Sequence, residues 1–258
     1  TAVNDQSGAN STVASVISAA IIVMTVLFLT PLFYYLPTAV LAAIIMVAVA
    51  GLFDYSEMKY LWKTDRKDLS MLFVTFFATL GLGIEEGIAV GVVLSLVLVI
   101  YSSTKPHSAE LGRLGKTKNY RNVNRYTEAI VDDEILIYRY DSPLFFANVE
   151  HFQETLYSKV DERGDDLQLV ILDASAMNSV DSTGSHALME IIEDLGQNEI
   201  SFYVAGAIGP VRDKLKKCGI QELMGDENFF FDVSDAVKSY HEIPNKIKKA
   251  FSPLQTNV

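Results

Sequence analysis

Long apolar segments dominate the first hundred residues, whereas short apolar and polar segments alternate in the rest of the chain. Four apolar runs stand out, at residues 12–30, 38–53, 69–83 and 88–103. A helix needs about 20 apolar residues to cross the hydrocarbon core of a bilayer. The first run is long enough and the second is interpreted as another crossing. The last two are shorter, so we expect a helical hairpin packed against other protein and joined by residues 84–87.

The basic residues orient these segments. In the first 104 residues, all four lie in the link 54–68, and another group follows residue 104. The links 31–37 and 84–87 contain none. Because Lys and Arg gather on the cytoplasmic side of membrane proteins, the link 54–68 and residues 105–258 are predicted to be cytoplasmic. Four crossings alternate consistently with that orientation and predict a multi-pass protein of the cell membrane.

The link 54–68 is itself predicted to form an amphipathic helix in the membrane interface. Its apolar side chains fall on one side and its basic side chains on another. The apolar set is Tyr55, Met58, Leu61 and Trp62, and the basic set is Lys59, Lys63 and Arg66.

Small residues recur every fourth position in the hairpin, at Gly83, Gly87, Gly91 and Ser95. That spacing lets two helices approach closely in lipid. Glu85 and Glu86 fall between the two apolar runs. Carboxylates at membrane depth are costly and usually functional, so an ion site is one interpretation. A turn at the outer surface is the interpretation that we prefer.

After residue 103, short strands alternate with amphipathic helices. This pattern predicts an α/β domain with a mostly parallel sheet. Strands are expected at 134–141, 167–173, 200–206 and 228–231, with residues 144–148 extended, and helices at 149–162, 182–196, 210–218 and 234–242. Asn148 is the expected N-cap of the first of these helices.

Composition supports a division of the 258 residues into two domains, 1–104 and 105–258. The first contains four basic and seven acidic residues, and the second contains 17 basic and 25 acidic ones. An acidic balance without a basic patch argues against nucleic acid as a partner. The single cysteine, Cys218, permits no internal disulfide and suits a reducing compartment.

No pattern of catalytic or metal-binding residues emerges from the sequence. The four histidines are scattered and have no metal-ligand spacing, and no nucleophile motif is present. His186 and Glu190 lie one helical turn apart, where a solvated pair is the simpler interpretation. We therefore expect neither an enzyme, nor a metal site, nor a cofactor.

The stretch 170–188, "VILDASAMNSVDSTGSHAL", leads from a buried strand through a polar loop into a helix. Asp173 ends the strand, at the sheet edge where open α/β folds bind ligands. Ser182 could cap the helix, or it could accept a phosphate that changes the charge of the helix start. A nucleotide site near Asp173 is a third possibility. The candidate regulatory residues are Asp173, Asp181, Ser182, Thr183 and Gly184.

The same stretch, "LDASAMNSVDSTGSHAL", resembles the signature loop of STAS domains, and Ser182 matches the phosphoacceptor position of anti-sigma-factor antagonists. "DSPLFFANVEHF" (141–152) is similar to the domain entry in transporter tails. The segments "LPTAVLAAIIMVAVAGLFDYSEMKYLWKTDRKDL" and "GIEEGIAVGVVLSLVLVIYSS" resemble the last spans of the sulfate permease (SulP) family. The resemblance covers residues 1–242.

The resemblance implies a C-terminal part of a secondary transporter for sulfate or bicarbonate. It also implies a homodimer and a regulatory cytoplasmic STAS domain with a possible regulatory protein partner. Members of the family bind an anion between two half-helices, and "TAVNDQSGA" resembles the second. The family's Ser-Arg pair would precede Thr1, so Thr1, Ala2 and Val3 are the anion-binding candidates, and this chain alone is not expected to transport. The start without Met suggests an internal segment.

A signalling protein is the alternative. In that interpretation, a membrane-anchored STAS module binds a kinase or an anti-sigma-type partner through the Ser182 face. An anchor needs only one or two generic spans. The shortened segments, the glycine-spaced hairpin and the amphipathic link favour the transporter.

Overall fold

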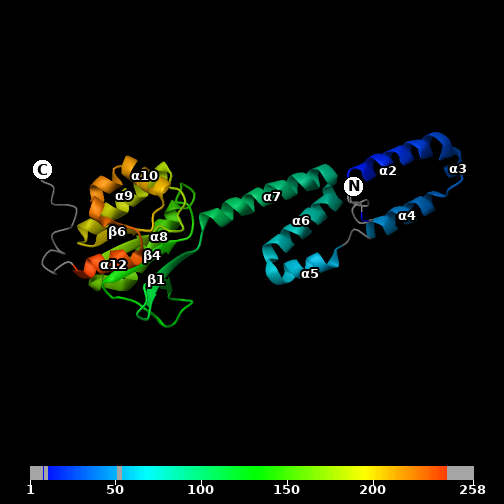
Figure 1. Ribbon diagram of the computed structural model, residues 1–258. Helices are drawn as coiled ribbons and strands as arrows, with labels where there is room; N and C mark the ends of the chain where they lie inside the picture. Colours follow the sequence, from blue (N-terminus) through cyan, green and yellow to red (C-terminus); the bar gives the residue numbers. More distant parts are fainter. Residues whose placement is uncertain (1–7, 9–10, 51–53, 243–258) are drawn as a thin grey trace. The chain divides into compact units, whose positions relative to one another are not determined.

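The computed structural model of the protein describes residues 8, 11–50 and 54–242. The chain divides into two compact units, Thr1–Gly91 and Val92–Val258. The boundary falls within one continuous helix, α7 (Ile84–Thr104) (Figure 1). The two units are described separately.

Helices make up the described part of the first unit, as the apolar pattern predicts. They are α2 (Val13–Met24), the π-helical turn η1 (Thr25–Leu29), α3 (Thr30–Phe33), α4 (Thr38–Ala50), α5 (Tyr55–Thr64), α6 (Arg66–Leu82) and the start of α7. The helix expected in the link 54–68 is α5, but it ends at Thr64, so Arg66 belongs to α6 instead. Asp54 and Asp65 begin α5 and α6, because the side chain of each accepts hydrogen bonds from backbone N–H groups of the following turn.

The expectation of four crossings is met only in part. Among the described residues, only α7 is both long and apolar enough to cross a membrane. Val13–Leu29 and Thr38–Val47 are shorter apolar helices. The helix α6 has 17 residues, and its first turn contains Arg66, Lys67 and Asp68. The apolar length available to α6 is correspondingly smaller.

The turn of the hairpin lies at a different place from the predicted one. Residues 84–87 do not form a link, because α7 already begins at Ile84 and includes Glu85 and Glu86 in its first turn. The change of direction occurs at Gly83, whose φ of 121° is a conformation that side-chain-bearing residues rarely adopt. Acidic side chains stabilise a helix start, which explains why these glutamates extend α7.

Glycine permits the close packing of α6 and α7. A Cβ atom on Gly87 would lie 2.1 Å from Thr79 Oγ1 and 2.5 Å from Thr79 Cα. One turn further along, a Cβ on Gly91 would lie 3.0 Å from the side chain of Thr75. Gly87 and Gly91 therefore do bring the two helices together, as their spacing predicts.

A seven-stranded sheet forms the centre of the second unit. Its strands are β1 (Ser108–Leu114), β2 (Tyr120–Asn122), β3 (Ala129–Ile130), β4 (Ile135–Tyr140), β5 (Leu169–Asp173), β6 (Ser201–Ala205) and β7 (Phe229–Phe230). Their order is β2-β1-β4-β5-β6-β7, and β3 also pairs with β1. The four strands predicted from the sequence are β4 to β7.

The sheet is mixed, so the prediction of a mostly parallel sheet is wrong. Strands β4 to β7 pair in parallel, as expected. Strand β1 instead pairs antiparallel with β2, β3 and β4. Residues 105–133 were not expected to contain strands. Their short, polar segments lack the apolar run that marks a central strand, and pairing along an existing edge stabilises them.

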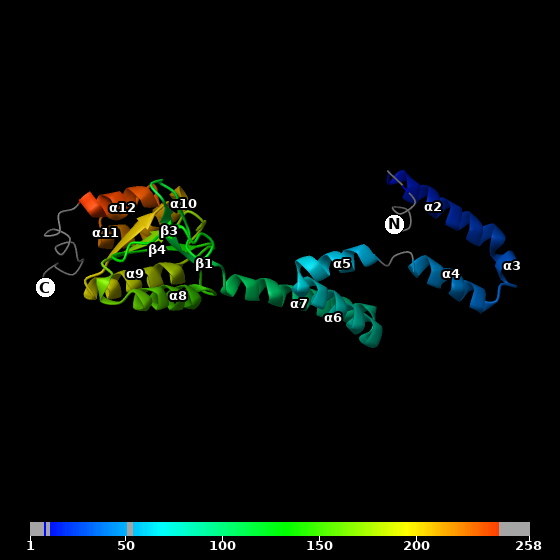
Figure 2. The same cartoon turned by 90° about the horizontal axis from the view of Figure 1, so that it is seen from below.

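Helices cover both faces of this sheet (Figure 2). They are α8 (Val149–Arg163), α9 (Ser182–Gln197), α10 (Gly209–Lys217), α11 (Ile220–Met224) and α12 (Val233–Glu242), with 3₁₀ turns at Gly164–Asp166 and Asp226–Asn228. Helices α8 and α9 lie on one face and α12 lies on the other. The larger core cluster joins α8 to α11 with the sheet, and the smaller one lies under α12.

Residues 144–148 do not continue β4 as an extended segment. Only Leu144 pairs, through an isolated bridge to Val180, and the chain then turns into α8. Asn148 precedes α8, as predicted, but its side chain does not cap that helix. The amide has other partners, which belong to the candidate site.

Candidate functional site

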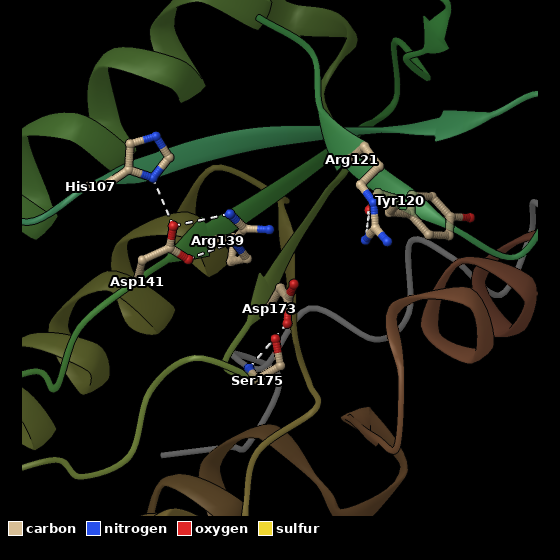
Figure 3. Close-up of polar contacts among 7 residues, drawn as sticks. All are labelled: His107, Tyr120, Arg121, Arg139, Asp141, Asp173 and Ser175. Atoms are coloured by element: carbon tan, nitrogen blue, oxygen red, sulfur yellow. Dashed lines mark hydrogen bonds and ion pairs between the residues drawn. The ribbon is translucent and has the colours of Figure 1, made fainter. Parts of the chain in front are cut away.

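The carboxyl ends of β4, β5 and β6 meet at one edge of the sheet, because these strands are parallel. Asp173 is the last residue of β5 and pairs in register with Arg139 of β4 and Ala205 of β6. Its side chain is buried, and its Oδ1 accepts a hydrogen bond from Ser175 N at 3.1 Å (Figure 3). Asp173 thus lies where the sequence places it and holds the loop that follows β5.

Asp181, and not Ser182, is the N-cap of α9. Its Oδ1 accepts a hydrogen bond from Gly184 N at 2.7 Å. Its Oδ2 accepts one from Phe146 N at 3.0 Å, in the loop after β4. One carboxylate therefore begins the helix and fastens a neighbouring loop. The capping interpretation of Ser182 is wrong because Asp181 already occupies that role.

Ser182 and Thr183 form the first turn of α9 and both are exposed. In the described part of the chain, no hydrogen bond of the Ser182 hydroxyl is found. Free N–H groups and the positive end of the helix dipole favour a negative charge at such a position. The exposed hydroxyl is chemically accessible, so its role as a phosphoacceptor stays a prediction.

Gly184 has a packing role. A Cβ atom there would lie 2.8 Å from the carbonyl oxygen of Leu144, and backbone cannot easily move away. Asp181 N also donates to that Leu144 oxygen, at 3.0 Å. The loop after β4 therefore approaches the start of α9 as closely as a glycine allows.

The structure brings Asp181, Ser182, Thr183 and Gly184 together in one helical turn. Asp173 belongs to the same sheet edge, but its side chain contacts Ser175 and approaches Gly206 rather than that turn. Two surface grooves of about 320 and 350 Å³ lie elsewhere in the unit, and none of the five residues lines either. The nucleotide interpretation therefore gains no support from these grooves.

A charged cluster at the same edge was not predicted from the sequence. Asp141 accepts hydrogen bonds from Arg139 Nε at 2.6 Å and Arg139 Nη2 at 3.0 Å, and its Oδ2 lies 2.7 Å from His107 Nδ1 (Figure 3). Partial burial raises the pKa of Asp141, but the hydrogen bonds from Arg139 and His107 outweigh burial and lower the pKa below its ordinary value. The hydrogen bond to Asp141 raises the pKa of Arg139.

Asn148 ties the end of α7 to the loop after β4. Its side chain is fully buried, and its Nδ2 donates to Pro143 O at 2.8 Å and lies 3.4 Å from Ser103 O in the last turn of α7. Its Oδ1 accepts a hydrogen bond from Phe145 N at 3.0 Å. The neighbouring Phe146 is 72% exposed. The signal that could have shown this junction is the polar Asn148 beside two consecutive phenylalanines.

The anion-binding candidates Thr1, Ala2 and Val3 lie outside the described residues. The helix α2, which follows them, contains no charged residue. Their assignment therefore rests on the resemblance alone.

Two family models match the chain. Residues 1–75 match the sulfate permease family, and residues 126–236 match the STAS domain. The helical unit and the mixed sheet thus correspond to two known modules. The chain belongs to the sulfate permease family and contains a STAS domain over residues 126–236.

Curated relatives match almost the whole chain. Sulfate transporter 4.1, chloroplastic, from Arabidopsis thaliana is 39% identical over 92% of this chain and 36% of its own length. High affinity sulfate transporter 2 from Stylosanthes hamata is 32% identical over 93% of the chain and 37% of its own length. The chain thus spans less than two fifths of these relatives.

A solved structure agrees with the fold. The murine Solute Carrier 26 family member A9 anion transporter in the inward-facing state has a TM-score of 0.75 and 28% sequence identity. The match covers 93% of this chain and 39% of the transporter. It extends through the helical unit as well as the sheet.

Proposed function

We propose that the full-length protein is a secondary transporter of an inorganic anion, sulfate or bicarbonate, and that this chain is its C-terminal part. Residues 1–104 supply membrane segments of the transport domain, and residues 105–258 form a cytoplasmic regulatory domain. The full-length protein works as a homodimer. The observation that carries the proposal is the joint match of 1–75 to the sulfate permease family and of 126–236 to the STAS domain.

The exposed apolar side chains and the helix packing of the first unit support this proposal. Its apolar side chains remain exposed in the described residues, whereas a soluble domain would cover them. The close hairpin of α6 and α7 is the kind of contact that helices make in lipid. In this proposal, further segments of the full-length protein cover the shorter apolar helices, Val13–Leu29 and Thr38–Val47. These helices then cross the membrane together with α7, so the protein is multi-pass.

Uptake of labelled sulfate into vesicles that contain the full-length protein tests the proposal. Saturable uptake, with bicarbonate as a competitor, is the expected result. Inhibition by bicarbonate means that both anions use one site. If neither labelled sulfate nor labelled bicarbonate enters the vesicles, the transporter proposal fails.

We propose further that the exposed turn Ser182–Thr183 is a regulatory surface that a cytoplasmic protein recognises. Two observations support it: Ser182 is accessible, and the exposed Phe146 lies in the loop that Asp181 fastens to the same turn. A phosphate on Ser182 adds about two negative charges close to Asp181, which favours release of an acidic partner or recruitment of an Arg-rich one.

The variants Ser182→Ala and Ser182→Glu of the full-length protein test this regulation. The expected result is that the two variants differ in transport rate. Equal and unchanged transport in both variants counts against a switch at Ser182.

The alternative function is a membrane-anchored signalling module that binds its partner through the Ser182 face. The exposure of Ser182 and Phe146 is the observation that favours it. Absence of anion uptake together with binding of a kinase or anti-sigma-type protein, lost on Ser182→Glu substitution, would establish this alternative.

A further inference from the structure

Four cations of the first unit gather at α5 and the start of α6. They are Lys59, Lys63, Arg66 and Lys67, and all four are exposed. Within residues 11–50 and 54–242, none of them forms an ion pair with an acidic side chain. Residues 59–67 contain these four positive charges and one negative charge, Asp65, so this stretch attracts an anionic ligand.

The acidic residues of the same link keep their charge, but their side chains lie at helix starts and form no ion pair with these cations among the described residues. Asp54 Oδ1 accepts hydrogen bonds from Ser56 N at 2.9 Å and Glu57 N at 3.1 Å. Asp65 Oδ1 accepts one from Lys67 N at 2.8 Å. Glu57 and Asp68 lie in the first turns of α5 and α6, where the helix dipole stabilises them.

Aromatic side chains accompany the cations. Tyr55 is 72%, Tyr60 is 60% and Trp62 is 63% exposed. Tyr and Trp are enriched where a membrane meets water, because their rings are amphipathic. The guanidinium of Arg66 lies 5.7 Å from the centre of the Trp62 ring, which places a cation beside the indole.

The helical spacing separates these groups into two neighbouring sides of α5. Tyr55, Met58 and Trp62 follow one another at intervals of three and four residues, so they share one side. Lys59 and Lys63 lie one turn apart on the adjacent side. A helix with this distribution lies along a membrane surface, with its apolar side toward the acyl chains and its lysines at the headgroups.

We propose that α5 lies in the cytoplasmic membrane interface and binds anionic phospholipid headgroups through Lys59 and Lys63, with Arg66 and Lys67 supporting the same charge. This inference rests on the proposed function, which places the link 54–68 at the cytoplasmic surface. It goes further by naming the ligand: a phosphate-bearing, negatively charged lipid of the inner leaflet.

Trp62 is the single tryptophan of the chain and provides a reporter inside α5. The whole chain is reconstituted into vesicles that contain either brominated phosphatidylcholine or brominated phosphatidylglycerol at equal mole fractions. Bromine atoms quench only nearby indoles, so the quenching of Trp62 measures which lipid lies beside α5. We expect the anionic lipid to occupy sites next to Trp62 about fivefold more strongly than the neutral lipid.

The variant Lys59→Gln/Lys63→Gln is expected to remove most of this preference while both lipids still quench Trp62. The matched control is Lys116→Gln/Lys118→Gln, which removes the same charge from an exposed turn of the second unit and is expected to keep the preference. Equal quenching by the two lipids in the unchanged chain overturns the inference. An unchanged preference in Lys59→Gln/Lys63→Gln overturns it too.

Extraction by alkaline carbonate distinguishes failure of the proposed function from failure of the lipid site. If alkaline carbonate extracts the chain from the vesicles, the chain is not a membrane protein, and both proposals fall. If the chain resists extraction but shows no lipid preference, only the anionic-lipid site is wrong.

Discussion

The two units of the chain differ in the exposure of their apolar side chains. In the described helices of the first unit, Leu27 is 68%, Phe28 is 72% and Val47 is 75% exposed. In the second unit, Leu136, Val170 and Ile171 have no exposed surface. Both units are rich in apolar residues. Only the second contains the layers of helix and sheet that cover those residues itself.

This difference shows that the second unit is stabilised by its own core, whereas the proposed function assigns the first unit to a lipid environment. Burial of apolar surface is the main favourable contribution to the folding of a water-soluble domain. A helix in lipid has no such contribution, so its contacts depend on close packing of small residues. Substitutions should therefore act through lost core volume in the second unit and through steric overlap in the first.

The largest expected effect is the loss of a core aromatic side chain. Phe152 is fully buried, and its ring centre lies 5.0 Å from that of Tyr140 and 5.7 Å from that of Tyr138. We expect Phe152→Ala to lower the free energy of unfolding of the second unit by about 3–5 kcal/mol. Hydrogen exchange of β4 and β5 in the whole chain, held in detergent micelles, measures this change.

Phe28→Ala is the matched control in the first unit. Because Phe28 is 72% exposed, we expect this change to alter the free energy of local opening of α2 and η1, measured by hydrogen exchange in micelles, by less than about 0.5 kcal/mol. A loss as large as that of Phe152→Ala would contradict the comparison, since it would mean that the first unit has a core of its own.

A smaller effect is expected from a single methyl group in the hairpin. A Cβ atom on Gly87 overlaps with Thr79, so Gly87→Ala should force α6 and α7 apart at a cost of about 1–3 kcal/mol. The readout is a disulfide between Thr75→Cys and Gly91→Cys in a Cys218→Ser background. An ideal Cβ on Gly91 lies 3.7 Å from Thr75 Cβ, which suits a disulfide.

We expect this disulfide to form readily and to become slower to form when Gly87→Ala is added. Gly81→Ala is the control, because a Cβ on Gly81 has no heavy atom within 4 Å. Equal rates of disulfide formation in the Gly87 and Gly81 variants would show that the hairpin does not depend on close approach at Gly87.

A third prediction concerns neighbouring residues at the candidate regulatory site. Asp181→Ala removes the N-cap of α9 and the acceptor of Phe146 N, so we expect a loss of about 1–2 kcal/mol in the second unit. Ser182→Ala should change the free energy of unfolding by less than about 0.5 kcal/mol, since Ser182 is exposed. Hydrogen exchange of α9 at increasing urea concentration measures the free energy of unfolding of both variants. A larger loss of unfolding free energy in Ser182→Ala than in Asp181→Ala would mean that Ser182, and not Asp181, caps α9.

The smallest expected effect is a pH dependence at the Asp141 cluster. The folded state lowers the pKa of Asp141, so this carboxylate stabilises the fold above its unfolded pKa of about 3.9, and the contribution is lost as the pH falls through the folded pKa. We expect Asp141→Asn to reduce the difference between the melting temperatures at pH 5 and pH 3. Glu128→Gln, which removes an exposed carboxylate, is the control. An identical difference in the Asp141 variant would exclude this linkage.

The sequence predicts the parallel part of the sheet because each of its strands carries a visible apolar run. Leu169–Asp173 is buried along its whole length, as an uninterrupted apolar run requires. The strands β1 to β3 were not predicted because their patterns are short and polar. Pairing of β1 with β4, and of β2 and β3 with β1, supplies their stabilisation. The family resemblance, which depends on motifs in order, was also available from the sequence.

The candidate site is divided in the same way. That Asp173 ends a strand and that a helix begins after residue 180 follow from local patterns. Which oxygen caps α9 does not, because Asp181 and Ser182 are both good N-cap residues. The position of Leu144, which accepts from Asp181 N and approaches Gly184, decides between them, and Leu144 lies far away in the sequence.

The sequence by itself determined the periodicities of this protein: apolar helices first, alternating strands and helices afterwards, and basic residues confined to one link of the first unit. These depend on neighbours within a few residues along the chain. Tertiary structure alone decided the mixed sheet and the contacts of Asn148 with the end of α7. Each of these needs groups from distant segments to meet, and the free energy of such contacts is absent from any local pattern.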